Sequence, residues 1–248
     1  MRAALLAALI PTAAPAQDHF PDRLWAADLL ILLEAGPAFL DPDLDLRVPA
    51  PPGPEETRSE LDRMQLISAR LRDERSRARI LLEAEADPRD LLLAEGLIPE
   101  PESAPTLWEI LDRAGGEATY FALREKRKFS RPRPSSARPE LGTTIPNPPH
   151  PAYPSGHSTQ IHTLAGLLAT LRPECGEAYR LFAAGVAFRR EIAGVHFPSD
   201  TRAGEILAGS LLPHILSHPD ISEVTGAARD ELRSAPIGAG CRSAGRGR

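Results

Sequence analysis

The stretch Pro154-Ser155-Gly156-His157 combines residue types that together can bind an anion and move a proton. Apolar residues then recur at helical spacing as far as Leu171, so the stretch stands at the start of a helix. A helix start offers unpaired N–H groups and the positive end of the helix dipole, and both suit an anion. Ser155 is a typical N-cap residue, and Gly156 allows a ligand to approach the backbone closely. His157 would lie beside that anion and can give or take a proton near neutral pH.

A basic cluster lies upstream, over residues 126–134 (KRKFSRPRP). Lys126 falls near the end of an expected helix, and Pro134 holds the preceding Arg133 in extended backbone. Arginine offers a planar fork for two oxygens, whereas lysine acts as a point charge. This mixture favours a small phosphate-like ligand, because it is a local positive site in a chain that is acidic as a whole. A solvated basic loop is the simpler alternative.

A third cluster lies downstream, over residues 190–200. Arg190 continues an apolar helix face, where a cation is costly unless it meets an anion. His196 falls in a loop, and Asp200 in the first turn of the next helix can reach back to one of its ring nitrogens. The other ring nitrogen is then free to act as a nucleophile, as in a catalytic triad. The sequence assigns no role to the remaining histidines, which are His19, His150, His162, His214 and His218.

Taken in order, the patterns Lys126-x6-Arg133-Pro134, Pro154-Ser155-Gly156-His157 and Arg190-x5-His196-x3-Asp200 resemble the signature of the type 2 phosphatidic acid phosphatase (PAP2) superfamily. That superfamily includes bacterial class A non-specific acid phosphatases, membrane lipid phosphatases and vanadium haloperoxidases. The motifs span residues 120–210. The export-like N-terminus and the proline-rich segment 39–54 look most like the class A acid phosphatases.

The resemblance implies a phosphomonoesterase that needs no metal or other cofactor and that vanadate inhibits. His196 would attack phosphorus and form a phosphohistidine, while Asp200 orients its ring. His157 would protonate the leaving alcohol and then activate water. The charge on the phosphate oxygens would be stabilised by Lys126, Arg133, Ser155, Gly156 and Arg190. The expected partners are small phosphate esters, and the oligomeric state stays open.

Two features leave alternatives open. The superfamily usually has serine before the motif arginine, whereas this chain has Arg189, so one hydroxyl donor to the phosphate is missing or replaced. Arg124 and Arg131 give a second register for the first motif, and we prefer Lys126 with Arg133 because that register keeps the lysine. The alternative functions are a vanadate-dependent haloperoxidase and a lipid or pyrophosphate phosphatase.

The composition and the N-terminus bear on where the protein works. A net charge of -5 argues against a nucleic-acid binder. Residues 1–16 read as a signal peptide that ends in Ala14-Pro15-Ala16, which would leave Gln17 as the first mature residue of a periplasmic or secreted protein. We expect no membrane segment after cleavage. In an oxidising compartment Cys175 and Cys241 could pair, although pairing and free thiols both remain open.

The elements that position these clusters are expected to be helices, because alternating strand patterns are scarce and only 5% of the residues are aromatic. We predict an all-α fold, a single globular helical bundle of the PAP2 and haloperoxidase type over residues 17–233, followed by a flexible tail over 234–248. The segment 55–85 is one long helix or a pair, Gly115-Gly116 loosens a helix over 106–128, and Ser199 caps another. The remaining expected helices are 24–34, 89–95, 155–171, 176–190 and 220–233.

Overall fold

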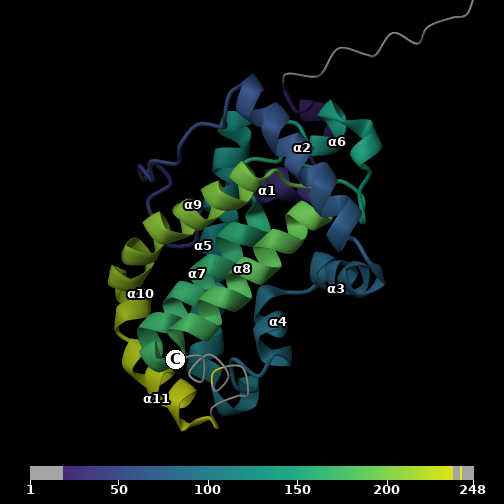
Figure 1. The fold of residues 1–248 in the computed structure, drawn as a ribbon. Coiled ribbons are helices and arrows are strands. Elements are labelled where there is room, and N and C mark those ends of the chain that lie inside the picture. The colour runs from purple at the N-terminus through teal and green to yellow at the C-terminus, as the bar shows by residue number, and fades with distance from the viewer. Residues whose placement is uncertain (1–18, 237–240, 242–248) are drawn as a thin grey trace, which may run out of the picture.

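The computed structural model describes residues 19–236 and residue 241 (Figure 1). The predicted signal peptide and the predicted mature start at Gln17 lie outside the described residues, as do most positions of the predicted tail. The described residues form helices and turns without a strand, so the all-α prediction is confirmed. Among them, no helix has both the length and the apolar character needed to cross a membrane.

Helix α7 (Gly156–Leu171) is the centre of the bundle, and it packs against α5 (Pro105–Phe129), α8 (Gly176–Ile192) and α9 (Pro198–Ser217). Its apolar residues are buried on more than one face, which is typical of a helix inside a core rather than on a surface. The helix begins as predicted, with Ser155 as N-cap and its side chain accepting from the Ser158 amide.

The shorter helices surround this centre. In Figure 1, α9 and α10 (Pro219–Ser222) lie on one side of the long helices, and α3 (Glu74–Glu85) and α4 (Pro88–Ala94) lie on the other. The other described α-helices are α1 (Ala27–Ala35), α2 (Pro54–Leu71), α6 (Pro134–Ala137) and α11 (Thr225–Ser234).

The structure shows that one of two expected helix breaks is present and the other is absent. The segment 55–85 is a pair, because Asp73 caps α3 by accepting from the Ser76 amide at 2.8 Å. The predicted loosening at Gly115-Gly116 is wrong, since α5 runs unbroken from Pro105 to Phe129. A long buried face of α5 lies against α7, and such tertiary packing outweighs the weak helix propensity of two glycines.

The predictions for the last helices need two corrections. Ser199 does not cap α9, because the helix starts at Pro198 and the Asp200 carboxylate accepts from the amide of Phe197. The expected helix over 220–233 is divided into α10 and α11.

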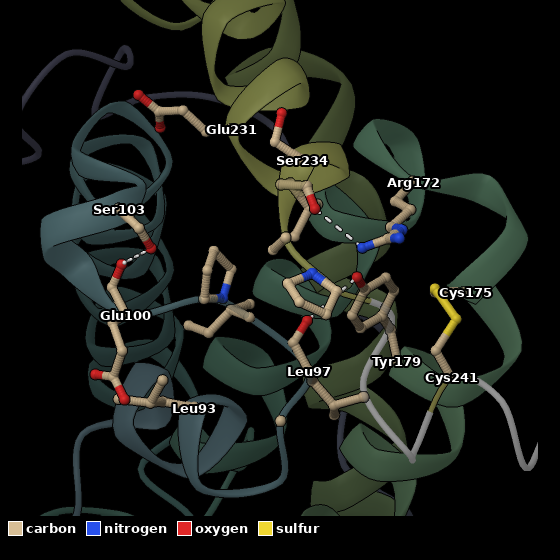
Figure 2. Close-up of a pocket in the computed structure, with 16 residues that line it drawn as sticks. Leu93, Leu97, Glu100, Ser103, Arg172, Cys175, Tyr179, Glu231, Ser234 and Cys241 are labelled. Atoms are coloured by element: carbon tan, nitrogen blue, oxygen red, sulfur yellow. Dashed lines mark hydrogen bonds between the residues drawn. A yellow bond between two sulfur atoms is a disulfide. The ribbon is translucent and has the colours of Figure 1, made fainter.

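A disulfide joins Cys175, next to the start of α8, to Cys241, with 5.1 Å between the two Cα atoms. Pairing, which the sequence left open, is therefore present. The bond lies at the wall of a pocket near α11, and the residues that line this pocket include none from the three motifs (Figure 2).

Candidate active site

Helix ends and loops bring the three motifs together. Lys126 lies in the last turn of α5, Arg133 directly precedes α6, and Gly156 opens α7. Arg190 lies in the last turn of α8, and His196 lies in the loop that leads into α9. These elements meet around a cavity of about 540 Å³, whose wall includes Lys126, Gly156, His157, Arg190 and His196.

Other parts of the wall come from α1, α3, further residues of α5 and α7, and the proline-rich loop 145–149. Leu29, Leu81 and Ala84 make this side apolar, while Asp28 and Glu85 add two carboxylates. The cavity therefore has a basic, histidine-lined side and a largely apolar side, as expected for a site that holds a small anion with an organic substituent.

The ring of His196 lies between an acidic side chain, Asp200, and a basic one, Arg133. Its side chain is 1% exposed, and its Nδ1 lies 3.2 Å from Oδ2 of Asp200. Its Nε2 lies 3.0 Å from Nη1 of Arg133. A guanidinium can only donate, so Nε2 carries the lone pair and Nδ1 carries the proton. Burial, followed by the positive field of Arg133, holds the pKa of His196 well below its usual range, which keeps that lone pair available.

Asp200 is anchored from the side away from the histidine. Arg131 donates from Nη1 to its Oδ1 at 2.6 Å and from Nη2 to Glu60 of α2 at 3.1 Å. Burial raises the pKa of Asp200, while the Arg131 guanidinium and the Phe197 amide act against this shift. Arg131, from the alternative register of the first motif, therefore supports Asp200, and Arg133 is the arginine that reaches His196.

Arg190 is a buried cation without a partner. Its residue is 2% exposed, and its Nε and Nη1 make no hydrogen bond with any described residue. Burial lowers its pKa to about 10, so it still carries its charge at neutral pH. Buried polar groups in proteins are nearly always paired, and an unpaired guanidinium on a cavity wall marks a place for an anion.

Lys126, predicted to bind the phosphate directly, is instead bonded to the loop before α7. Its ammonium donates to the carbonyl oxygens of Pro151, Ala152 and Pro154, at 2.8, 3.1 and 2.5 Å. Three acceptors use all three of its protons. Burial is the main cause that lowers its pKa. Lys126 thus holds the loop before α7 in place and adds positive charge to the cavity wall, and a direct bond to a ligand requires the release of one carbonyl.

The amides at the start of α7 are only partly free. The Ser155 amide, predicted as an anion donor, instead donates to the carbonyl of Asp200 at 2.9 Å, so this prediction is corrected. Ser155 serves as the cap and as a link between α7 and α9. The amides of Gly156 and His157 form no hydrogen bond with other described residues, and they remain the donors at this helix start.

His157 faces the same cavity from the first turn of α7. Its Nε2 lies 3.3 Å from the backbone oxygen of Glu83, at the end of α3. Burial and the nearby Arg190 lower the pKa of His157 to about 3, so the imidazole of the free site is neutral.

His150 belongs to the site although the sequence assigned it no role. It lines the cavity, and its Nδ1 accepts from Nη2 of Arg133 at 3.0 Å. The backbone oxygen of His150 also accepts from Nε of Arg133 at 3.1 Å. His150 lies outside all three motifs, and only its place four residues before Pro154, in the loop that enters the second motif, could have suggested a role.

Part of this chain is similar in sequence to known proteins. Residues 114–219 match the PAP2 superfamily. Non-specific acid phosphatases from Salmonella typhi and Salmonella typhimurium are each 30% identical to this chain over an alignment of 141 positions, and the match covers 53% of this chain. The match spans about half the length of these curated relatives, 55% of each.

Among solved structures, a transmembrane PAP2 type phosphatidylglycerolphosphate phosphatase from Bacillus subtilis has a TM-score of 0.48 at 15% sequence identity, over 76% of this chain and 90% of that one. All three motifs lie inside the segment that matches the superfamily. The segment that matches the PAP2 superfamily, residues 114–219, runs along the chain from before Lys126 to beyond Asp200.

Proposed function

We propose that this protein is an acid phosphatase that hydrolyses phosphate monoesters through a phosphohistidine at His196, without a metal ion. One observation carries the proposal: the guanidinium of buried Arg190, whose Nε and Nη1 bond to none of the described residues, shares a cavity with the Nε2 lone pair of His196. An anion held by the first group would lie beside a nucleophile in the second. Phosphate esters are anions whose central atom such a nucleophile attacks.

Binding would begin with the substrate phosphate beside Arg190 and the amides of Gly156 and His157. Arg133 would turn its Nη1 from His196 to a phosphate oxygen, which frees the Nε2 lone pair at the moment when the substrate is in place. These donors would stabilise the charge on the equatorial oxygens in the transition state. Lys126 would add positive charge from behind the loop.

In the first chemical step, Nε2 of His196 forms a bond to phosphorus as the bond to the leaving oxygen breaks. Asp200 stabilises the positive charge that develops on the imidazole. His157, which is neutral in the free site, takes up a proton at Nδ1 from the monoprotonated phosphate ester as it binds, and gives this proton to the leaving oxygen. The bound phosphate makes this possible because it offsets the field of Arg190, which together with burial holds the pKa of His157 at about 3 in the free site.

In the second step, a water molecule gives a proton to His157 and attacks phosphorus. The bond between nitrogen and phosphorus breaks, and its electron pair returns to Nε2 of His196. Inorganic phosphate takes this proton from His157 as it leaves, so the next substrate finds both histidines neutral, as in the free site.

The test is release of phosphate from an aryl phosphate in the presence of a chelator, beside a halide-oxidation assay with added vanadate. We expect phosphate release that the chelator leaves unchanged and that vanadate blocks. Halide oxidation would indicate a haloperoxidase instead, and loss of phosphate release in chelator, restored by a metal ion, would contradict the mechanism. Activity restricted to lipid phosphates or pyrophosphate would change the substrate class.

We also propose that the protein is exported to the periplasm or secreted. The disulfide between Cys175 and Cys241 supports this, because such bonds persist in oxidising compartments. Intact-mass analysis of the exported protein is expected to give a chain that starts at Gln17. A mass that still includes residues 1–16 would contradict cleavage after Ala16.

A further inference from the structure

We propose that Glu83 is a positioning residue for His157: its side chain, held by Arg189, fixes the last turn of α3 so that its backbone oxygen holds the imidazole with Nδ1 toward the cavity. This inference deepens the proposed function. The effect on reaction rates that we expect from it rests on that proposed function. The orientation of the ring does not depend on that function.

The carboxylate of Glu83 is fully buried between two arginines. Arg189 donates to it twice, from Nε to Oε2 and from Nη2 to Oε1, both at 2.7 Å. Arg79 donates from Nε to Oε1 at 2.6 Å. Paired charged hydrogen bonds of this kind have both strength and a fixed geometry. They attach the end of α3 to α8, the helix that also carries Arg190.

The backbone carbonyl of Glu83 makes the contact with His157. Glu83 lies in the last turn of α3, where carbonyl oxygens lack partners within the helix. Its oxygen lies 3.3 Å from Nε2 of His157. A carbonyl can only accept, so Nε2 carries the proton of the neutral ring. The lone pair is then on Nδ1, which has no hydrogen-bond partner in the part of the chain that the structure describes, on a ring that lines the cavity.

This arrangement explains what Arg189 does in the place where the superfamily usually has serine. Arg189 is absent from the wall of the cavity, whereas the next residue, Arg190, lies on it. Neighbouring residues of a helix point in different directions, so the two arginines serve different partners. Arg189 thus acts on the site through Glu83 and His157, and its side chain does not replace the hydroxyl donor.

The first test is the tautomer of His157, read from its ring ¹⁵N chemical shifts by NMR. We expect the wild-type ring to carry its proton on Nε2. Glu83→Gln and Arg189→Gln should each release the turn and give a mixture of the two tautomers. Glu95→Gln is the matched control, because Glu95 pairs with Arg79 but does not touch His157, and it should leave the spectrum unchanged.

The second test compares two leaving groups. A nitrophenolate leaves with little need of a proton, whereas an alkoxide needs one, so loss of ring orientation should lower kcat for an alkyl phosphate about tenfold and for an aryl phosphate about twofold or less. Destabilisation of the whole fold would lower both rates together. Arg189 is partly exposed, so Arg189→Gln keeps both tests open if Glu83→Gln does not fold.

An unchanged tautomer in both variants would overturn the inference, as would an unchanged ratio of the two rates. If wild-type protein released no phosphate from any ester, the proposed function would fail, and the NMR result alone would still decide the role of Glu83.

Discussion

Two cavities of nearly equal size differ in almost every chemical respect. The motif cavity has a volume of about 540 Å³, and the pocket beside the disulfide, drawn in Figure 2, has about 550 Å³. In the disulfide pocket several polar groups have partners within the protein, although Nε of Arg172 makes no hydrogen bond with a described residue and only lies 3.4 Å from the Glu174 carboxylate. The Tyr179 hydroxyl donates to the Leu97 carbonyl, Arg172 donates to the Leu232 carbonyl, and Glu231 accepts from the amide of Leu107.

The motif cavity has the opposite character. Two nitrogens of Arg190 have no hydrogen-bond partner among the described residues, and Nε2 of His196 lies within hydrogen-bond distance of the Arg133 guanidinium. The comparison teaches that volume does not locate chemistry in this molecule. Satisfied polar groups indicate a structural region, and a buried cation without a partner indicates a ligand site.

The largest expected effect is in the motif cavity. His196→Ala removes the nucleophile and should lower kcat for every phosphoester by at least about a thousandfold, as removal of a catalytic nucleophile does in other enzymes. Ser103→Ala, in the wall of the disulfide pocket, should leave kcat unchanged. Acid-labile label from substrate should be trapped on His196 in the wild type. Label on another residue, or a fully active His196→Ala protein, would contradict the assignment.

The disulfide pocket should respond in stability rather than in catalysis. The bond joins residues 66 positions apart, and loss of this loop closure in Cys175→Ser should lower the free energy of unfolding by about 4 kcal/mol on the chain-entropy argument. At a temperature where the variant is folded, kcat should match the wild type. Denaturant unfolding and phosphate release measure the two quantities. A fall in kcat of the folded variant would remove the distinction between the two cavities.

A smaller, substrate-dependent effect is expected from His157→Ala. Loss of the acid should lower turnover of alkyl phosphates about a hundredfold and of aryl phosphates much less. Phosphoenzyme should accumulate, because the same residue activates the water of the second step. Asp200→Asn should lower both rates by a similar factor, since it acts on His196 rather than on the leaving group. Equal losses for both substrates in His157→Ala would count against its role as the acid.

The smallest effect is a pH dependence of stability. The pKa of His157 is lowered to about 3 in the folded protein, so between this value and its ordinary value near 6.5 the unfolded chain binds more protons. The contribution is present above pH 6.5 and is lost as pH falls, by up to about 2 kcal/mol at pH 5. Glu191, whose pKa is raised to about 7, acts in the opposite direction.

The difference between wild type and His157→Gln isolates the His157 contribution from that of Glu191. Unfolding free energies measured at pH 5 and pH 7.5 should show a shallower slope for the variant. Equal slopes would mean that His157 titrates as an exposed histidine does. The disulfide pocket is lined by no histidine among the described residues, so substitutions there should not alter the slope.

The sequence was sufficient for the features that depend on local patterns. Helical spacing of apolar residues predicted the all-α fold and the position of α7, and residue chemistry singled out Ser155 as a cap. The three motifs predicted which side chains gather, because each stands at a helix end or in a loop that a bundle brings to one side. The motifs that contain Lys126, His157 and His196 were enough to predict that these three side chains share one site.

Only the tertiary structure decided what each group contacts. The Ser155 amide donates to the backbone carbonyl of Asp200, and the ammonium of Lys126 donates to three loop carbonyls. Segments distant in sequence supply these acceptors. Arg131 and Arg133 have the same residue type two positions apart, yet one reaches Asp200 and the other reaches His196. A sequence states which groups can bond, but the fold alone sets which acceptors lie within 3 Å of each donor.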